Sequence, residues 1–227
     1  MVRVKKTAVR LLFILAVLLL LSLSVWQLKR GWDKAAILHQ VAAESQDYQL
    51  LAQIPTDFNR LEYRSVQLQG TWLKDEVFLL DNRIYRQQPG YEVLNVFKLM
   101  SGQLLLVNRG WVSKRPSLAL RSIINNTPTG ILYRPIKGYS IGESLETNTG
   151  WPKVSLYMDL PAFSQALGKP LLPLVLVLEA NQPDSFTRIW QPVVVTPARH
   201  YAYALQWFGL AIVLLVFGFI WRKQGRF

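Results

Sequence analysis

The sequence contains no cysteine, and it has only two histidines and three methionines among 227 residues. The absence of cysteine excludes disulfide bonds, thiolate metal sites, c-type haem attachment and a thiol nucleophile. It also excludes copper binding by paired cysteines, and the scattered Met1, Met100 and Met158 form no thioether copper site. A chain without thiols is compatible with an oxidising and with a reducing compartment, so the cysteine count does not locate the protein.

Recognisable catalytic motifs are also missing. The sequence has no G-x-S-x-G, H-E-x-x-H, P-loop or G-x-G-x-x-G pattern. His39 lies among alanine and leucine residues, where a surface or interface position is the simplest interpretation. Asp75 and Glu76 fall in an expected turn and are most simply solvated, and no nucleophile stands at a recognisable spacing from a base. We therefore expect a protein that is not an enzyme.

Two long apolar segments, one near each end, are the most informative features that are present. Residues 11–28 and 201–221 contain no charged side chain. At about 1.5 Å per helical residue, each segment can cross a hydrocarbon core of roughly 30 Å. We expect two transmembrane helices, 11–28 and 201–221, that flank a water-soluble domain formed by residues 29–200.

The charges beside these segments predict an orientation. Short basic tails stay in the cytoplasm, so residues 1–10 and 222–227 are expected there and the domain on the other side of the membrane. Three basic residues just after the first segment favour the opposite orientation: Lys29, Arg30 and Lys34. They belong to a long translocated region, where charge has less effect on orientation. A cleaved signal peptide is the alternative; the length of the apolar run and the missing A-x-A site oppose it. With only ten residues before the first segment, we expect a bacterial inner-membrane protein rather than a mitochondrial precursor.

The net charge of +12 does not indicate nucleic-acid binding. More than half of it comes from seven basic residues in the two tails, which leaves the middle of the chain near +5. No basic stripe interleaved with aromatic residues occurs there. Contact of the tails with anionic lipid accounts for the excess charge.

Short apolar or alternating runs separated by Gly, Pro and Asn predict a β-rich middle domain. The fold class expected is a membrane-anchored α+β protein with a mainly antiparallel β domain, built as a barrel or a sandwich. The first helix is expected to continue through 31–51, and loops are expected at 123–130 and 139–150. A short helix should begin after Asp159 and end at Gly168. The expected strands include residues 66–69, 77–80, 91–97, 104–112, 131–136, 154–158, 174–178 and 189–195.

Polar and aromatic residues gather at the two membrane edges. Trp26 and Arg30 share a helix face, and Gln27 should face protein because an amide is costly in lipid. In the second segment His200, Tyr203 and Trp207 fall on one face. Anchoring at the headgroup level is the simpler interpretation. The alternative is an inward-facing site, since neutral imidazole is an axial ligand for haem iron and aromatic rings pack against the macrocycle.

Three motifs occur in order along the chain: Trp26-Gln27-Leu28-x-Arg30, Val107-Asn108-Arg109-Gly110-Trp111-Val112 and His200-x-x-Tyr203-Ala204-x-Gln206-Trp207-Phe208. Together with the two flanking apolar segments, these motifs resemble the surfeit locus protein one family, whose members are assembly factors for cytochrome c oxidase. One departure is Ser24, where the family commonly has glycine.

The resemblance implies a non-enzymatic role in maturing the catalytic subunit of the oxidase, at the stage of haem a insertion. Haem binding by the second-span histidine of bacterial members carries over onto His200, as a ligand of the haem iron. The expected partners are the oxidase catalytic subunit, haem a synthase and the membrane, with no nucleic acid.

Further roles follow from position within these motifs. Tyr203 and Trp207 would form pocket walls, and Gln206 would bond a polar haem substituent or cross to Gln27. Arg30 or Arg199 would pair with haem propionates, because guanidinium matches carboxylate in a bidentate fashion. The same site would include Trp26.

Arg109 and Trp111 in the middle motif are expected to contact the oxidase subunit. The alternative for Arg109 is a strand-end residue that holds a turn. Two competing functions also remain: a cofactor-free membrane-tethered sensing or scaffolding domain, and a membrane enzyme that acts on a lipid or quinone.

Overall fold

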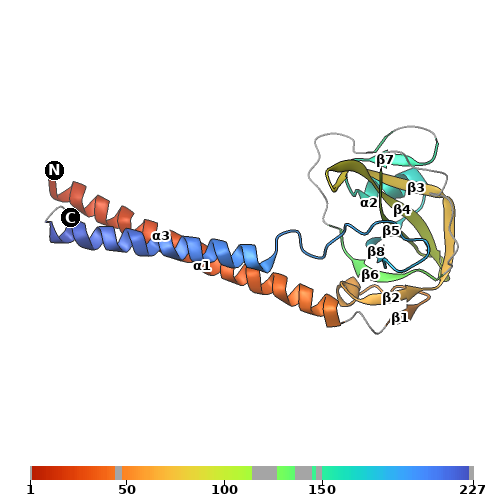
Figure 1. The fold of residues 1–227 in the computed structure, drawn as a ribbon, viewed down its shortest axis with the longest axis horizontal. Helices are drawn as coiled ribbons and strands as arrows, with labels where there is room; N and C mark the ends of the chain where they lie inside the picture. Colours follow the sequence, from red (N-terminus) through yellow and green to blue (C-terminus); the bar gives the residue numbers. More distant parts are fainter. Residues whose placement is uncertain (1, 44–47, 114–126, 136–144, 147–149, 225–227) are drawn as a thin grey trace. The chain divides into compact units, whose positions relative to one another are not determined.

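The computed structural model describes residues 2–43, 48–113, 127–135, 145, 146 and 150–224. The chain divides into two compact units, one formed by 1–39 with 193–227 and the other by 40–192. The first unit holds two long helices, and the second holds a β-sheet with a short helix (Figure 1). The expected fold class, two end helices flanking a β-rich domain, is confirmed.

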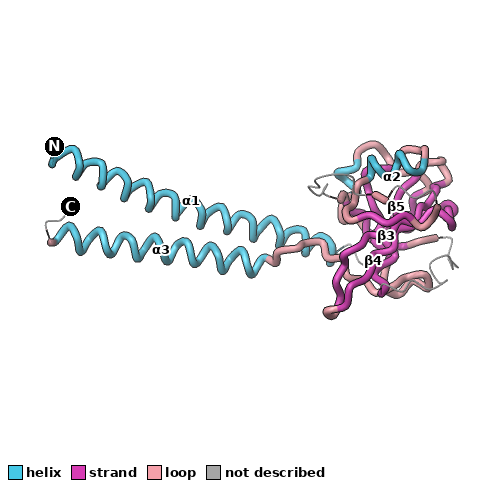
Figure 2. The backbone as a smooth tube through the Cα atoms, turned by 90° about the horizontal axis from the view of Figure 1, so that it is seen from above, coloured by secondary structure: helices cyan, strands magenta, loops and turns pink. Residues whose placement is uncertain are grey.

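The long helices are α1 (Val2–Ala43) and α3 (Pro197–Lys223), and they contain the two apolar segments. Both are long and apolar enough to cross a membrane. They run side by side, with the two chain ends at the same end of the pair (Figures 1 and 2). Only 11% and 17% of their most apolar stretches is buried. Core helices of soluble proteins are mostly buried, so this exposure favours a lipid environment.

The two helices contact each other through small residues at a spacing of seven. The spacing of seven keeps one face of each helix toward its neighbour, and small side chains let the backbones approach closely. The Ser24 hydroxyl donates a hydrogen bond to the Ala204 carbonyl oxygen at 2.9 Å. A methyl group added at Gly218 would overlap the Phe13 ring. The buried positions of this helix seam are Val17, Ser24 and Gly31 on α1, and Ala204, Ala211 and Gly218 on α3.

The second unit is built on one eight-stranded sheet with the order β1-β2-β6-β8-β5-β4-β3-β7. Four neighbouring pairs are antiparallel and three are parallel, including the central pair β5–β8. The antiparallel character of the domain was therefore predicted correctly, although the three parallel pairs were not foreseen. The strands are β1 (Gln49–Leu51), β2 (Ser65–Leu68), β3 (Gly70–Tyr85), β4 (Gln88–Leu99), β5 (Leu104–Ser113), β6 (Thr129–Tyr133), β7 (Lys153–Ser155) and β8 (Leu171–Leu178).

The central strands of the sheet are buried on both faces. On β5, Leu105 and Val107 point into one apolar cluster, and Leu104 and Leu106 point into another. The first cluster includes side chains from β2 and from the start of β3, so the sheet curls around it. The second is covered by α2 (Leu160–Leu167), whose buried Phe163 stacks on a β3 ring. Burial on both sides explains why β5 reads as a continuous apolar run.

The short helix α2 follows the capping signals of its sequence. The Asp159 carboxylate accepts a hydrogen bond from the Ala162 backbone N–H at 3.2 Å. Pro161 occupies the first turn, and Gly168 ends the helix at φ 65°. Aspartate at the start and a left-handed glycine at the end satisfy backbone groups that the helix leaves unpaired.

Several expectations about local structure were wrong. Asp75 and Glu76 lie within β3 rather than in a turn. Gln49–Leu51 is not helical but forms β1, because its backbone pairs with β2. Residues 189–195 form no strand, and Pro192 within them cannot donate a ladder hydrogen bond. Strand β3 does not stop at Asp81; a bulge there, with Asn82 at φ 60°, lets it continue to Tyr85. The loops expected at 123–130 and 139–150 lie largely outside the described residues, and Thr129 and Gly130 belong to β6.

The helix seam can be tested by cross-linking, because the chain has no native cysteine. We expect the pair Ser24→Cys with Ala204→Cys to form a disulfide on mild oxidation of membranes, seen as a mobility shift that reductant reverses. Val25 is 66% exposed, so Val25→Cys with Ala204→Cys is the matched control and should stay reduced. Equal cross-linking of both pairs would contradict the seam.

Candidate functional site

The first and third sequence motifs meet in the helix pair. Nδ1 of His200, in the first turn of α3, lies 2.7 Å from Oε1 of Gln27 on α1. Both side chains are half-buried. The sequence predicted that Gln27 faces protein, and its partner is His200 rather than Gln206. Two residues 173 positions apart in the chain therefore form one polar contact inside an apolar pair of helices.

The chemistry of this contact determines the tautomer of the imidazole. An amide oxygen can only accept a hydrogen bond, so Nδ1 of His200 carries the proton. Nε2 of the neutral ring then keeps its lone pair. A histidine whose other nitrogen donates to an oxygen is the usual arrangement of a metal-ligating imidazole, because that hydrogen bond holds the ring and raises its basicity.

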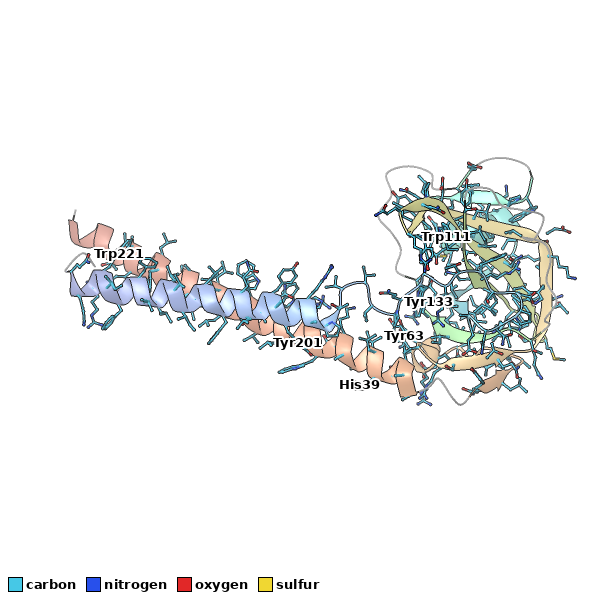
Figure 3. The ribbon with its side chains drawn as sticks, in the orientation of Figure 1. His39, Tyr63, Trp111, Tyr133, Tyr201 and Trp221 are labelled. Atoms are coloured by element: carbon cyan, nitrogen blue, oxygen red, sulfur yellow. The ribbon has the colours of Figure 1, made fainter. Side chains whose placement is uncertain are left out.

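Two residues that were not assigned to the site shape the helix contact around His200. Gly31 is buried, and a methyl group at its position would overlap the ring of Tyr201, at the start of α3 (Figure 3). Ser24, the departure from the family pattern, keeps the helices close and adds its bond to the Ala204 carbonyl. The seven-residue spacing of small residues was the signal that would have identified both positions.

The other predicted residues of α3 are divided between two surfaces. Trp207 is half-buried and lies seven residues after His200, on the same side of the helix. Tyr203 is 48% exposed, and Gln206 is also exposed. The structure therefore brings together His200, Gln27 and the side of α3 that bears Trp207, whereas Tyr203 and Gln206 lie on the outer surface of the helix pair.

On α1, Trp26 and Arg30 interact with each other. The Arg30 guanidinium carbon lies 5.8 Å from the centroid of the Trp26 ring, a cation–π geometry. Both side chains are exposed, as is Arg199 on α3. These arginines are thus accessible to an anionic group near the level of His200.

Arg109 and Trp111, the residues expected to contact a partner, are buried in the sheet domain. Their exposed fractions are 2% and 9%. Arg109 Nε donates to the Asp184 backbone carbonyl at 2.8 Å, and Nη1 donates to Oδ1 of Asn95 at 3.2 Å. Its guanidinium lies 4.6 Å from the Phe186 ring centroid. These contacts tie β5 to the segment that follows β8, which agrees with the alternative of a residue that holds a turn.

Burial also changes the acidity of Arg109. Desolvation lowers the pKa of its guanidinium from the ordinary 12.5 to about 10, and the Asp184 carboxylate opposes that shift. The side chain therefore remains charged at neutral pH.

The two residues after Arg109 are also fixed by the fold. Gly110 adopts φ 109°, which only glycine adopts readily, and Trp111 Nε1 donates a hydrogen bond to the Arg83 carbonyl oxygen at 2.9 Å.

A second buried polar group lies beside this motif. Asn108 Nδ2 donates to Oε1 of Glu92 at 2.8 Å, and Oε2 of Glu92 pairs with Arg83 Nε at 3.1 Å. Burial, with the nearby Glu92 charge, raises the pKa of Tyr133, which is labelled with Trp111 in Figure 3. Sequence reasoning missed this group. The signal was an acidic residue, Glu92, inside an otherwise apolar strand. Among the residues that the structure describes, no cluster of three or more His, Asp or Glu could hold a metal ion.

The buried role of Arg109 predicts a loss of stability when it is removed. Arg109→Ala leaves Asn95 and the Asp184 carbonyl without their donor, and we expect the free energy of unfolding to fall by about 3 kcal/mol. Denaturant unfolding of the full chain in detergent, followed by tryptophan fluorescence, measures it. Arg60 is exposed and pairs with the exposed Asp57, so Arg60→Ala should cost less than about 1 kcal/mol. Equal losses would contradict the structural role of Arg109.

Comparison with known proteins supplies the family. The family model described as "SURF1 family" matches residues 14–212, a range that contains all three motifs. A SURF1-like protein of Rickettsia felis is 28% identical over 214 residues, which cover 91% of this chain and 93% of the relative. A SURF1-like protein of Monosiga brevicollis is 23% identical, and the match covers 90% of this chain and 84% of the relative. A SURF1-like protein of Drosophila melanogaster is 25% identical, and the match covers 89% of this chain and 73% of the relative. The chain belongs to the SURF1 family.

Proposed function

We propose that this protein assists the assembly of cytochrome c oxidase by holding haem a, as cargo, before its insertion into the catalytic subunit. The observation that carries the proposal is the 2.7 Å contact between His200 Nδ1 and Gln27 Oε1, which leaves Nε2 free to bond iron. Family membership and the order of the three motifs support the same role. The role is non-enzymatic: the protein binds and releases, and it forms or breaks no covalent bond of the cargo.

The residues present fit a haem held by one protein ligand. The only other histidine, His39, lies twelve residues beyond Gln27 on α1, about 18 Å along the helix. The helix pair therefore offers one imidazole to the iron. A single axial bond retains the cargo less tightly than two, which suits transfer to another protein. Trp26 and Trp207 provide aromatic surface, and Arg30 or Arg199 provide partners for the propionates.

We further propose that both helices cross the bacterial inner membrane, with the tails in the cytoplasm and the sheet domain in the periplasm. The exposed apolar side chains of α1 and α3 and the basic residues of the tails support this orientation. His200 then lies at the periplasmic edge, where a macrocycle can enter lipid while its propionates stay in water. The partners in this proposal are the oxidase catalytic subunit and haem a synthase.

A cofactor-free scaffold is the competing function, and one observation favours it. The hydrogen bond between His200 and Gln27 forms without any ligand and would by itself fix the helix ends. The two functions differ in what they require at position 200. A scaffold needs a hydrogen-bond donor to Gln27, whereas a haem site needs an imidazole.

His200→Asn separates the two functions, because its amide N–H can still donate to Gln27 but cannot replace imidazole at iron. From cells that make haem a, we expect wild type to purify with a Soret band and His200→Asn to lose both that band and support of the oxidase. His39→Asn is the matched control and should behave as wild type. Full oxidase maturation with His200→Asn would exclude the ligand role and leave the scaffold.

Gln27 should act on the cargo through His200. Gln27→Leu removes the acceptor for Nδ1, and we expect haem to dissociate about tenfold faster, measured by transfer to excess apomyoglobin. Gln27→Glu keeps an acceptor and should retain slow release. Gln206→Leu removes an exposed amide that does not bond His200 and serves as the control. Unchanged release from Gln27→Leu would show that the contact does not orient the ligand.

A further inference from the structure

A cavity of about 540 Å³ lies between α1 and α3, far from His200. Phe13 and Ile14 line it from α1, and Leu215, Gly218 and Phe219 line it from α3. Its lining residues Arg10 and Arg222 place it near the start of α1 and the end of α3, beside Trp221, which is labelled in Figure 3. Leu215, the lining residue of α3 nearest to His200, lies fifteen residues beyond it, about 22 Å along the helix, so the cavity is separate from the haem site proposed above.

The seven-residue spacing of the helix seam changes on α1 at this cavity. The buried residues Val17, Ser24 and Gly31 recur every seven positions on α1. One step of seven before Val17 is Arg10, which also lines the cavity. A long charged side chain at a position otherwise held by small or apolar residues prevents close contact. On the opposite helix Gly218 has no side chain, and the Phe13 ring lies against its backbone.

Two arginines give the cavity its charge. Arg10 from α1 and Arg222 from α3 complete its lining. No acidic side chain occurs in residues 1–32 or 193–227, and the first one, Asp33, lies about 35 Å along α1 from Arg10. The two guanidinium groups therefore have no carboxylate side chain of this unit within reach.

The lining combines a cationic rim with apolar walls. Guanidinium binds phosphate through paired hydrogen bonds. Phe13, Leu215 and Phe219 are apolar surface suited to hydrocarbon. Basic pockets between transmembrane helices on the cytoplasmic side bind the headgroups of anionic lipids. A free phosphate ion would satisfy the arginines but would leave the aromatic walls unused.

We propose that this cavity binds one anionic phospholipid, with its phosphate between Arg10 and Arg222 and its acyl chains along Phe13, Leu215 and Phe219. The proposal depends on membrane insertion of the helix pair and does not depend on haem binding. The bound lipid fills the cavity and joins the two helix ends through one phosphate. It thereby stabilises the end of the pair opposite to His200.

Spin-labelled lipids test the proposal directly. The full-length protein is reconstituted in phosphatidylcholine vesicles that contain a small fraction of spin-labelled phosphatidylglycerol, and the motionally restricted fraction is compared with that of labelled phosphatidylcholine. We expect wild type to select phosphatidylglycerol, and Arg10→Gln with Arg222→Gln to reduce that selectivity about tenfold. The double variant Lys5→Gln with Lys6→Gln removes two positive charges near the same end of α1. It should retain most of the selectivity for phosphatidylglycerol. Equal loss in both double variants would reduce the effect to general tail charge and overturn the proposal.

A second variant keeps the charges and fills the space. Ile14→Trp should lose the selectivity for phosphatidylglycerol with both arginines intact, and its persistence would overturn the assignment to the cavity. Protease protection checks that every variant has the orientation of wild type.

Sodium phosphate and sodium chloride at equal ionic strength distinguish the two sources of phosphate. We expect the two salts to release the spin-labelled lipid equally and weakly. Selective release of the lipid by phosphate would show a site for the free ion and overturn the lipid assignment.

Discussion

The close approach of α1 and α3 is the constraint on which both proposed sites depend. Small residues at a spacing of seven allow the backbones to meet, and the Ser24 bond to Ala204 lies within one helical turn of the contact between Gln27 and His200. Where small residues continue the spacing of seven, the polar contact between Gln27 and His200 lies between the helices. Where Arg10 interrupts it, a cavity opens. One packing pattern thus explains a histidine with a fixed tautomer at one end and a cationic pocket at the other.

The sheet domain is stabilised in a different way. Its central strand β5 is buried on both faces, and polar side chains inside it are tied to other strands and loops. Arg109 joins β5 to Asp184 and Asn95, and Glu92 joins Asn108 to Arg83. Paired buried charges contribute to a unique arrangement, and they are costly to disturb. The motif around Arg109 is therefore a structural element of the domain, and a partner would meet the surface that it shapes.

The parts of this structure that depend on local pattern were predicted from the sequence. The apolar lengths indicated α1 and α3, and capping residues located α2. Long-range contacts were not predictable in the same way. Nothing local shows that Gln27 meets His200 rather than Gln206, because that depends on how two helices rotate against each other. Strand β1 forms through pairing with β2 against a helical pattern, and the burial of Arg109 depends on where the segment after β8 folds back.

The central claim is that Nε2 of His200 bonds the iron of the cargo. The chain has two histidines, so protein labelled with ¹⁵N-histidine on a His39→Gln background carries the label at one imidazole. The direct measurement is pulsed electron paramagnetic resonance of this protein loaded with ferric haem a. The account predicts a hyperfine coupling from one labelled nitrogen to the iron. Bound haem without any coupling to labelled histidine would contradict it.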